Sequence, residues 1–307
     1  MRKILIILTI ILSLNLCAQK NTRLSKKDED TILRIDEKIT QLPNGNIQIV
    51  WTDKRTKVKL KEEQFKDSIK DGMCAYYYGN GKPKEVVYYK LGKKDGIYKT
   101  FYESGMPTIT GYYKENMEDG IFTYYFLNGN KQAMKGFTMG QDEGAIVMFD
   151  STGVRLVDGS YKNGKRHGYW QDFYNNGKPR LAAYFKNGEY DGPYTDYFEN
   201  GRVHVKTFFL SGKQEGQRME FDSLGIPVKR LTFRYGHEAG SFENYYPNGK
   251  VMENGYYAQS KLHGKYKKFY DDGRIMEEGE YHMGNKMGKW YSYDNDGNRI
   301  KTKYLKF

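Results

Sequence analysis

The chain has 307 residues and is rich in glycine (34), tyrosine (29) and phenylalanine (16), but it contains only 7 prolines. This aromatic content excludes a disordered tail, and the glycine content favours many short strands joined by tight turns. The formal net charge is +12, and most of the excess is lysine in predicted turns. We interpret the charge as a solvated basic surface and expect no nucleic-acid partner.

The first residues have the layout of a secretory signal peptide. Arg2 and Lys3 provide a positive start, residues 4–16 are mostly apolar, and Ala18 is a small residue at the expected cleavage point. The apolar stretch is too short to span a bilayer of about 30 Å. We therefore expect residues 1–18 to be a signal peptide and the protein to be exported to the periplasm, the cell envelope or the outside of the cell.

Cys17 leaves a second interpretation of this segment open, which is a lipid anchor. A lipobox cysteine normally follows Gly, Ala or Ser, whereas the residue here is Leu16. Soluble export is thus favoured, and membrane contact is expected only if Cys17 is lipidated. After cleavage behind Ala18, Cys74 would be the single cysteine, which excludes an internal disulfide and a thiolate metal cluster.

Residues 19–71 lack the repeat that follows them. Residues 26–38 mix charged and aliphatic side chains and are compatible with a short helix. A turn sequence at residues 43–46 precedes a strand-like run at 47–51. We interpret the whole segment as a cap that shields the edge of the first repeat, because open arrays need such protection. An independent functional domain is the alternative.

From residue 72 onward the sequence has a period of 24 residues. A glycine begins each copy and a second glycine follows nine residues later, through ten copies without insertion or deletion. We number repeat positions from the first glycine, so Gly72 is position 0 and Gly81 is position 9. The first glycines are Gly72, Gly96, Gly120, Gly144, Gly168, Gly192, Gly216, Gly240, Gly264 and Gly288.

Aromatic residues recur at fixed positions of the repeat. Position 5 is aromatic in all ten copies and position 17 in nine, with Leu305 in the tenth; position 2 is aromatic in most. We expect positions 5 and 17 to form the core. Positions 2 and 5 face opposite sides of a regular strand. Either both faces of the sheet therefore carry rings, or a bulge returns them to one face.

One well-formed copy shows the expected structure of the unit. Residues 265–270 and 275–282 are strand-like runs, and the turn sequence at 271–274 contains Gly273. A single hairpin is at best marginally stable in water, so the hairpins must pair edge to edge. The predicted fold is all-β: an elongated open antiparallel β-meander of ten 24-residue β-hairpin repeats over residues 72–307.

The repeat resembles a known family. Gly168-Tyr169-Trp170-Gln171-Asp172-Phe173, followed by Asn176-Gly177-Lys178, is similar to MORN repeats, and more closely to the bacterial MORN-variant repeats of the YwqK antitoxin family. The resemblance covers about residues 72–307. It implies a meander that binds other macromolecules rather than converting a substrate, and it implies an antitoxin or immunity role with a toxin as the protein partner.

No catalytic or metal-binding constellation is apparent in the sequence. His167 and His263 occupy the slot before the first glycine, which is acidic in most copies, so we interpret it as a polar turn position. Residues 294–297 resemble the start of a calcium loop, but Gly297 is simply the tenth turn glycine. Cys74 occupies a mostly aromatic slot. We expect no enzyme activity, no cofactor and no metal.

The candidate binding surface lies in two half-aromatic columns, at positions 6 and 16. Such rings in a row suit recognition of a protein or, alternatively, of cell-wall polysaccharide. The competing interpretation is that they cover a second face or pack repeat on repeat. The candidates are Tyr78, Tyr102, Phe126, Tyr174, Phe198, Tyr246 and Tyr270 at position 6, and Tyr88, Tyr112, Tyr184, Phe208 and Tyr256 at position 16.

Overall fold

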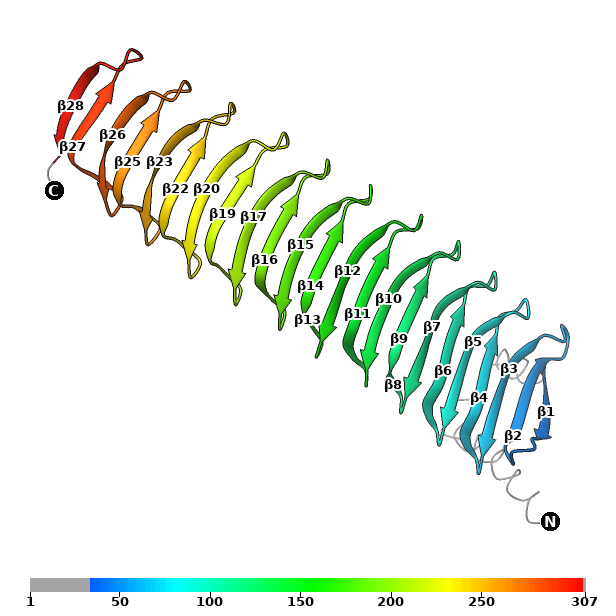
Figure 1. Ribbon diagram of the computed structural model, residues 1–307. Helices are drawn as coiled ribbons and strands as arrows, with labels where there is room; N and C mark the ends of the chain where they lie inside the picture. Colours follow the sequence, from blue (N-terminus) through cyan, green and yellow to red (C-terminus); the bar gives the residue numbers. More distant parts are fainter. Residues whose placement is uncertain (1–33, 306–307) are drawn as a thin grey trace, which may run out of the picture. The chain divides into compact units, whose positions relative to one another are not determined.

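The computed structural model describes residues 34–305 (Figure 1). All regular structure in this range is β, with no helix. The chain divides into two compact units, Met1–Gln141 and Asp142–Phe307. The predicted signal peptide and Cys17 lie outside the described residues.

Unit 1 is an antiparallel meander in which each hairpin pairs with the next (Figure 1). Its strands are β1 (Ile35–Gln41), β2 (Ile47–Asp53), β3 (Lys59–Lys66), β4 (Ile69–Tyr77), β5 (Pro83–Lys90), β6 (Lys93–Phe101), β7 (Pro107–Lys114), β8 (Met117–Glu118), β9 (Gly120–Tyr125) and β10 (Lys131–Thr138).

Unit 2 continues the same pattern from β11 (Gln141–Phe149) and β12 (Arg155–Lys162). The remaining strands are β13 (Lys165–Arg166), β14 (Gly168–Phe173), β15 (Pro179–Lys186), β16 (Glu189–Tyr197), β17 (Val203–Leu210), β18 (Lys213–Gln214), β19 (Gly216–Phe221), β20 (Pro227–Arg234), β21 (His237–Glu238), β22 (Gly240–Tyr245), β23 (Val251–Ala258), β24 (Lys261–Leu262), β25 (Gly264–Phe269), β26 (Ile275–His282), β27 (Asn285–Tyr293) and β28 (Arg299–Leu305). The predicted all-β meander of hairpin repeats is confirmed.

Two kinds of turn close each repeat, and both need residues that tolerate positive φ. At position 9, Gly177 has φ 78°, and its N–H donates to the Tyr174 carbonyl at 2.9 Å. At the other end of the sheet Asn187 (φ 53°) and Gly188 (φ 89°) form the two-residue loop between β15 and β16. Positive φ at both loop residues matches the twist of the flanking strands, which explains the regular glycines.

Each repeat also contains two irregularities in strand pairing. The residue at position 12 is extra: Asp172 pairs with Leu181 and Phe173 with Pro179, so Arg180 has no partner in the register. A second bulge lies at the first glycine, which has positive φ. In five repeats this bulge interrupts the first strand of the hairpin and leaves a separate two-residue strand before it, such as β13. Bulges of this kind bend the strand and raise its twist.

Positions 4 and 5 of the same strand point to opposite faces of the sheet. In β4, the Tyr76 hydroxyl donates to Glu63 at 2.7 Å, whereas the Tyr77 hydroxyl donates to Glu62 at 2.5 Å, and the two glutamates alternate along β3. Positions 2, 4, 13, 15 and 17 share one face, which we call the inner face. Positions 1, 3, 5, 14, 16 and 18 share the outer face. Both faces therefore carry rings, which was one of the two alternatives.

Apart from Ala75 at position 3, the buried apolar residues lie on the inner face, at positions 2, 13, 15 and 17. Trp170 at position 2 is 3% exposed, and Gly159 at position 15 lies beneath it, so that a Cβ there would come within 2.1 Å of the ring. The expectation that position 5 is core is wrong, because those rings lie half-buried on the outer face; position 17 is buried at Phe137 and Phe185 only. The buried apolar residues are Cys74, Ala75, Val87, Phe122, Phe137, Ile146, Trp170, Leu181, Ala183, Phe185, Val205, Leu231, Phe242, Tyr266 and Trp290.

The segment before the repeats forms strands. Ile35–Gln41 is β1, so the short helix expected over residues 26–38 is wrong where the structure describes it; its first part lies outside the described residues. The strand expected from Ile47 is confirmed as β2. Strand β3 pairs with β4 in the register that later repeats use, so β2 and β3 form a further, degenerate hairpin. Whether it acts as a cap stays a prediction.

Candidate binding surface

The rings of the inner face are occupied by contacts within the chain. Trp170 meets Tyr161 edge to face, with 5.6 Å between ring centroids, and the Arg166 guanidinium lies 4.4 Å from the Trp170 ring. The Lys94 Nζ lies 5.1 Å from the ring centroid of Tyr98 and 5.1 Å from that of Tyr113. A cation over a ring face and an edge-to-face neighbour both stabilise the ring where it is. These contacts stabilise the inner rings within the chain.

The tyrosines at position 6 link neighbouring repeats. The hydroxyl of each donates to the position 5 carbonyl of the next repeat, for example from Tyr246 to Phe269 at 2.6 Å and from Tyr270 to Tyr293 at 2.8 Å. Tyr78, Tyr102 and Tyr174 make the same bond. Phe126 and Phe198 are half-buried in the same column without a hydroxyl. Position 6 therefore packs repeat on repeat, and a role in binding stays a prediction.

Three repeats carry aspartate at position 6 and close the same turn in another way. The Asp150 carboxylate accepts the N–H groups of Thr152 and Val154, both at 2.9 Å. The hydrogen bond from the Thr152 hydroxyl, together with these backbone bonds, holds the pKa of Asp150 below its ordinary value. The Asp294 carboxylate likewise accepts the backbone N–H groups of Asp296 and Asn298. This agrees with the interpretation of residues 294–297 as a turn.

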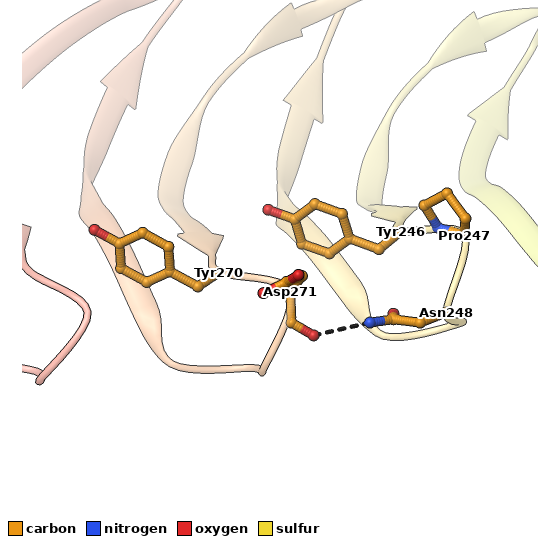
Figure 2. A pocket seen from close by; sticks show the side chains of 5 residues that line it. All are labelled: Tyr246, Pro247, Asn248, Tyr270 and Asp271. Carbon is orange, nitrogen blue, oxygen red and sulfur yellow. Dashed lines mark hydrogen bonds between the residues drawn. The ribbon is translucent and has the colours of Figure 1, made fainter.

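A hollow of about 420 Å³ opens between two successive turns of unit 2 (Figure 2). Tyr246 and Tyr270 lie side by side at its wall, and Pro247, Asn248 and Asp271 complete the lining. The Asn248 amide donates to the Asp271 carbonyl at 2.9 Å. Because both hydroxyls and this amide are already bonded within the chain, we interpret the hollow as the gap between two steps of the position 6 column.

The rings at position 16 are exposed on the outer face. Their exposed fractions range from 38% at Tyr88 to 53% at Tyr256, and Tyr112, Tyr184 and Phe208 lie between these values. Position 16 pairs with position 1 of the same repeat, as Tyr184 does with Tyr169. Position 1 adds further exposed apolar residues that sequence reasoning missed, since only the pairing register places positions 1 and 16 side by side.

These exposed residues form one patch in each unit. The unit-1 patch consists of Tyr88, Ile97, Tyr112 and Ile121 on strands β5, β6, β7 and β9. The unit-2 platform consists of Tyr169, Tyr184, Pro193 and Phe208 on strands β14 to β17. Tyr256 lies apart on β23, where its register partner is Ser241.

The slot before the first glycine orders the opposite turn. Asp191 accepts the Ser211 N–H at 3.0 Å, and Glu143 accepts the Asn163 N–H at 2.8 Å. This bond explains why the slot is acidic in most repeats and agrees with its interpretation as a polar turn position. His167 and His263 replace the acid in this slot, and their backbone N–H groups remain in the bulge hydrogen bond at 2.9 and 2.8 Å.

A buried charged cluster replaces the inner aromatic packing at the first repeat. Glu63 is 4% exposed and faces Cys74 in the register; it accepts bonds from Lys70 at 2.7 Å, Tyr76 at 2.7 Å and Lys61 at 3.0 Å. Burial alone would raise the pKa of Glu63, but these hydrogen bonds outweigh it and lower the pKa. Burial and the bond to Glu63 raise the pKa of Tyr76 to about 12.

Two further kinds of feature are absent from residues 34–305. No group of three or more His, Cys, Asp or Glu side chains in this range is placed to hold a metal ion. None of the described segments forms a helix with the length and apolar character needed to cross a membrane.

Five repeats match the family model of the MORN repeat variant. The matched residues are 70–91, 94–115, 166–187, 239–259 and 262–283, each in phase with the 24-residue period. The chain carries MORN-variant repeats. The matches start two residues or one residue before the first glycine and end at position 19, so they cover the bulge, both strands and the position 9 turn.

Comparison with solved structures gives only remote similarity. The chain is similar to a mutant of the Photorhabdus luminescens Tc holotoxin pore at 10% identity and TM-score 0.21, and to the TcdB2-TccC3 complex at 10% identity and TM-score 0.15. Each comparison covers 87% of this chain but only 17% and 18% of the other. Values this low carry no argument about function. No curated protein sequence matches the chain.

Proposed function

We propose that the protein is a non-catalytic, exported scaffold that binds another protein through the unit-1 patch. The observation that carries the proposal is the row of Tyr88, Ile97, Tyr112 and Ile121, in which Ile97 is 46% and Ile121 is 61% exposed. Contiguous exposed apolar side chains mark interaction surfaces, and an isoleucine gains most from burial against a partner's apolar side chains.

The MORN-variant repeats support a binding scaffold, because each repeat adds one equivalent row to the same sheet. The finer proposal is an antitoxin or immunity component, as the resemblance to the YwqK family implies, with a toxin as the partner. The signal-like N-terminus supports action in the periplasm or cell envelope, with lipid anchoring at Cys17 as the alternative. The proposed function requires no cofactor.

An affinity pull-down with residues 19–307 against the cell-envelope fraction tests this function. We expect mass spectrometry to identify one dominant protein, whose purified form binds the chain directly. The Ile97→Lys, Ile121→Lys double variant should abolish that binding, because it places two charges in the apolar contact.

Leu224→Lys is the matched control, since Leu224 is 68% exposed in a position 9 turn of unit 2 and does not belong to the unit-1 patch. Its binding should equal that of the unchanged chain. Recovery of no specific protein, or equal binding by the double variant, would overturn the proposal.

A further inference from the structure

We propose that the unit-2 platform binds an acidic polysaccharide. This second binding site goes beyond the protein-binding function proposed for unit 1. It consists of Tyr169, Tyr184, Pro193 and Phe208, which follow one another across strands β14, β15, β16 and β17 on the outer face.

The register makes the platform continuous. Tyr169 pairs with Tyr184, and their ring centroids are 5.1 Å apart. Pro193 lies in the bulge opposite Tyr184 and pairs with Phe208 on its other side. All four side chains are exposed, with values of 46%, 43% and 42% for the three aromatic residues. The four strands thus present an unbroken row of rings to solvent.

The composition of the platform differs from that of the unit-1 patch. Every platform side chain is cyclic, whereas Ile97 and Ile121 supply half of the unit-1 patch. Flat, stiff rings on a sheet lose little conformational entropy on binding. The face of a pyranose ring carries axial C–H groups, which pack well against an aromatic ring. The two tyrosine hydroxyls can then bond to sugar hydroxyls at the edge of the row.

The spacing of the rings favours a polymer over a single sugar. Tyr184 and Phe208 occupy the same position in successive repeats and are separated by two strand spacings, about 9.6 Å. A monosaccharide cannot cover both rings. An extended chain that crosses the strands can contact Tyr169, Tyr184 and Phe208 in turn.

The charge beside the platform selects an acidic chain. Lys186 lies two residues after Tyr184 and Lys206 two residues before Phe208, so both share the outer face, and Lys162 occupies the position of Lys186 one repeat earlier. All three are exposed, and no hydrogen bond or ion pair of theirs occurs within residues 34–305. Their ammonium groups are free to meet the carboxylates of a uronic acid polymer.

Nearby carboxylates are mostly engaged elsewhere. Asp191 and Glu143 accept turn N–H groups, and Asp158 pairs with Arg155 at 2.5 Å. Glu189 stands opposite Lys186 in the register, and its carboxylate lies over Gly212 of the next turn. The charge next to the rings is therefore positive, which complements a polyanion.

Binding of the full chain to polygalacturonate, measured by titration calorimetry, tests the proposal. We expect binding that strengthens with oligomer length from one to six sugars, weakens as salt is added, and falls strongly on the methyl ester of the same polymer. The Tyr184→Ala, Phe208→Ala double variant should lose at least about tenfold in affinity, which corresponds to roughly 1.4 kcal/mol. Lys186→Gln with Lys206→Gln should weaken binding and reduce its salt dependence.

Matched variants control for the chemistry of each substitution. Tyr256→Ala removes an exposed ring from the same repeat position outside the platform, and Lys261→Gln removes an exposed lysine at another turn. Both should bind as the unchanged chain does. Each platform variant should keep its circular dichroism spectrum and melting temperature, since these side chains make few buried contacts.

Several outcomes would overturn the proposal. They are no binding to polygalacturonate, unchanged binding by the Tyr184→Ala, Phe208→Ala variant, and equal binding of poly-glutamate, which would point to an acidic polypeptide. The Ile97→Lys, Ile121→Lys variant should retain polysaccharide binding. Failure of this proposal is therefore distinguishable from failure of the protein-binding function.

Discussion

Tyr169 and Trp170 are neighbours in the sequence, yet they lie on opposite faces of β14 and have opposite exposure. Trp170 on the inner face is 3% exposed, whereas Tyr169 on the outer face is 46% exposed. The inner ring is enclosed by Tyr161, Phe185 and the Arg166 guanidinium. The outer ring touches only Tyr184 among aromatic side chains of the described chain.

The same difference separates the inner and outer faces as a whole. On the inner face a large ring at position 2 lies over a small residue at position 15, as Trp170 does over Gly159. On the outer face, positions 1 and 16 both carry large side chains in many repeats. Neither side chain can therefore cover the other and bury it. The sheet thus builds most of its core on one face and leaves exposed rings on the other.

The largest effect should come from Trp170→Ala on the inner face. Truncation of this buried ring removes its apolar contacts and leaves a cavity, which should cost about 3–5 kcal/mol of unfolding free energy. Tyr169→Ala is the control on the outer face and should cost well under half of that. Urea unfolding of both variants measures the contrast, and similar losses would show that the two faces are not distinct.

Next in size is the replacement of the buried carboxylate in Glu63→Ala. Lys61, Lys70 and Tyr76 lose their shared acceptor; because the two lysines are about a third exposed, solvent screens part of the loss and we expect about 2 kcal/mol. The pKa of Glu63 is lowered in the folded state, so its contribution is present at neutral pH and lost as the pH falls through and below the ordinary glutamate value of about 4.3. The stability difference between the two chains should shrink from about pH 7 to about pH 3; a constant difference would contradict an ionised Glu63.

Gly177→Val should destabilise the position 9 turn. A β-branched residue at φ 78° is strained by about 1–3 kcal/mol, although the nearest atom to the added Cβ, Val154 Cγ1 at 3.9 Å, is only in ordinary contact. Gly79→Val tests the same side chain in a turn where φ is not positive and no atom lies within 4 Å of the added Cβ. Thermal unfolding should show a lower melting temperature for the first variant only.

The smallest effect should come from single hydroxyl groups. Tyr270→Phe removes the bond to the Tyr293 carbonyl and should cost about 1 kcal/mol, because that carbonyl loses a partner. Tyr256→Phe removes a hydroxyl on the exposed position 16 ring and should leave the unfolding free energy unchanged within about 0.5 kcal/mol. Equal effects would show that positions 6 and 16 do not differ in this way.

The repeat and the hairpin were predictable from the sequence for a local reason. Turns such as Asn176-Gly177 and Asn187-Gly188 require positive φ, and only a few residue types tolerate it. Regularly spaced glycines therefore reveal the 24-residue period. The predicted strand after residue 46 rests on the same kind of turn signal. In contrast, no turn signal supported the short helix expected over residues 26–38. Pairing with β2 makes Ile35–Gln41 a strand instead.

The burial of the aromatic columns could not be predicted in the same way. The ring at position 5 recurs in every repeat and was expected in the core, yet it lies half-buried on the outer face. The bulge at position 12 and the bulge at the first glycine decide which columns meet. The position 12 bulge has no distinct residue type, since Arg180, His204 and Val228 all occupy it. The pairing of Tyr169 with Tyr184 depends on that register as well.

The sequence by itself determined the period, the turns, the all-β class and the MORN-variant character, because each follows from residues close together in the chain. The tertiary structure alone decided which rings are buried, which are bonded repeat to repeat, and which form the two exposed patches. Those outcomes depend on contacts between strands, where one residue of register moves a side chain to the other face of the sheet.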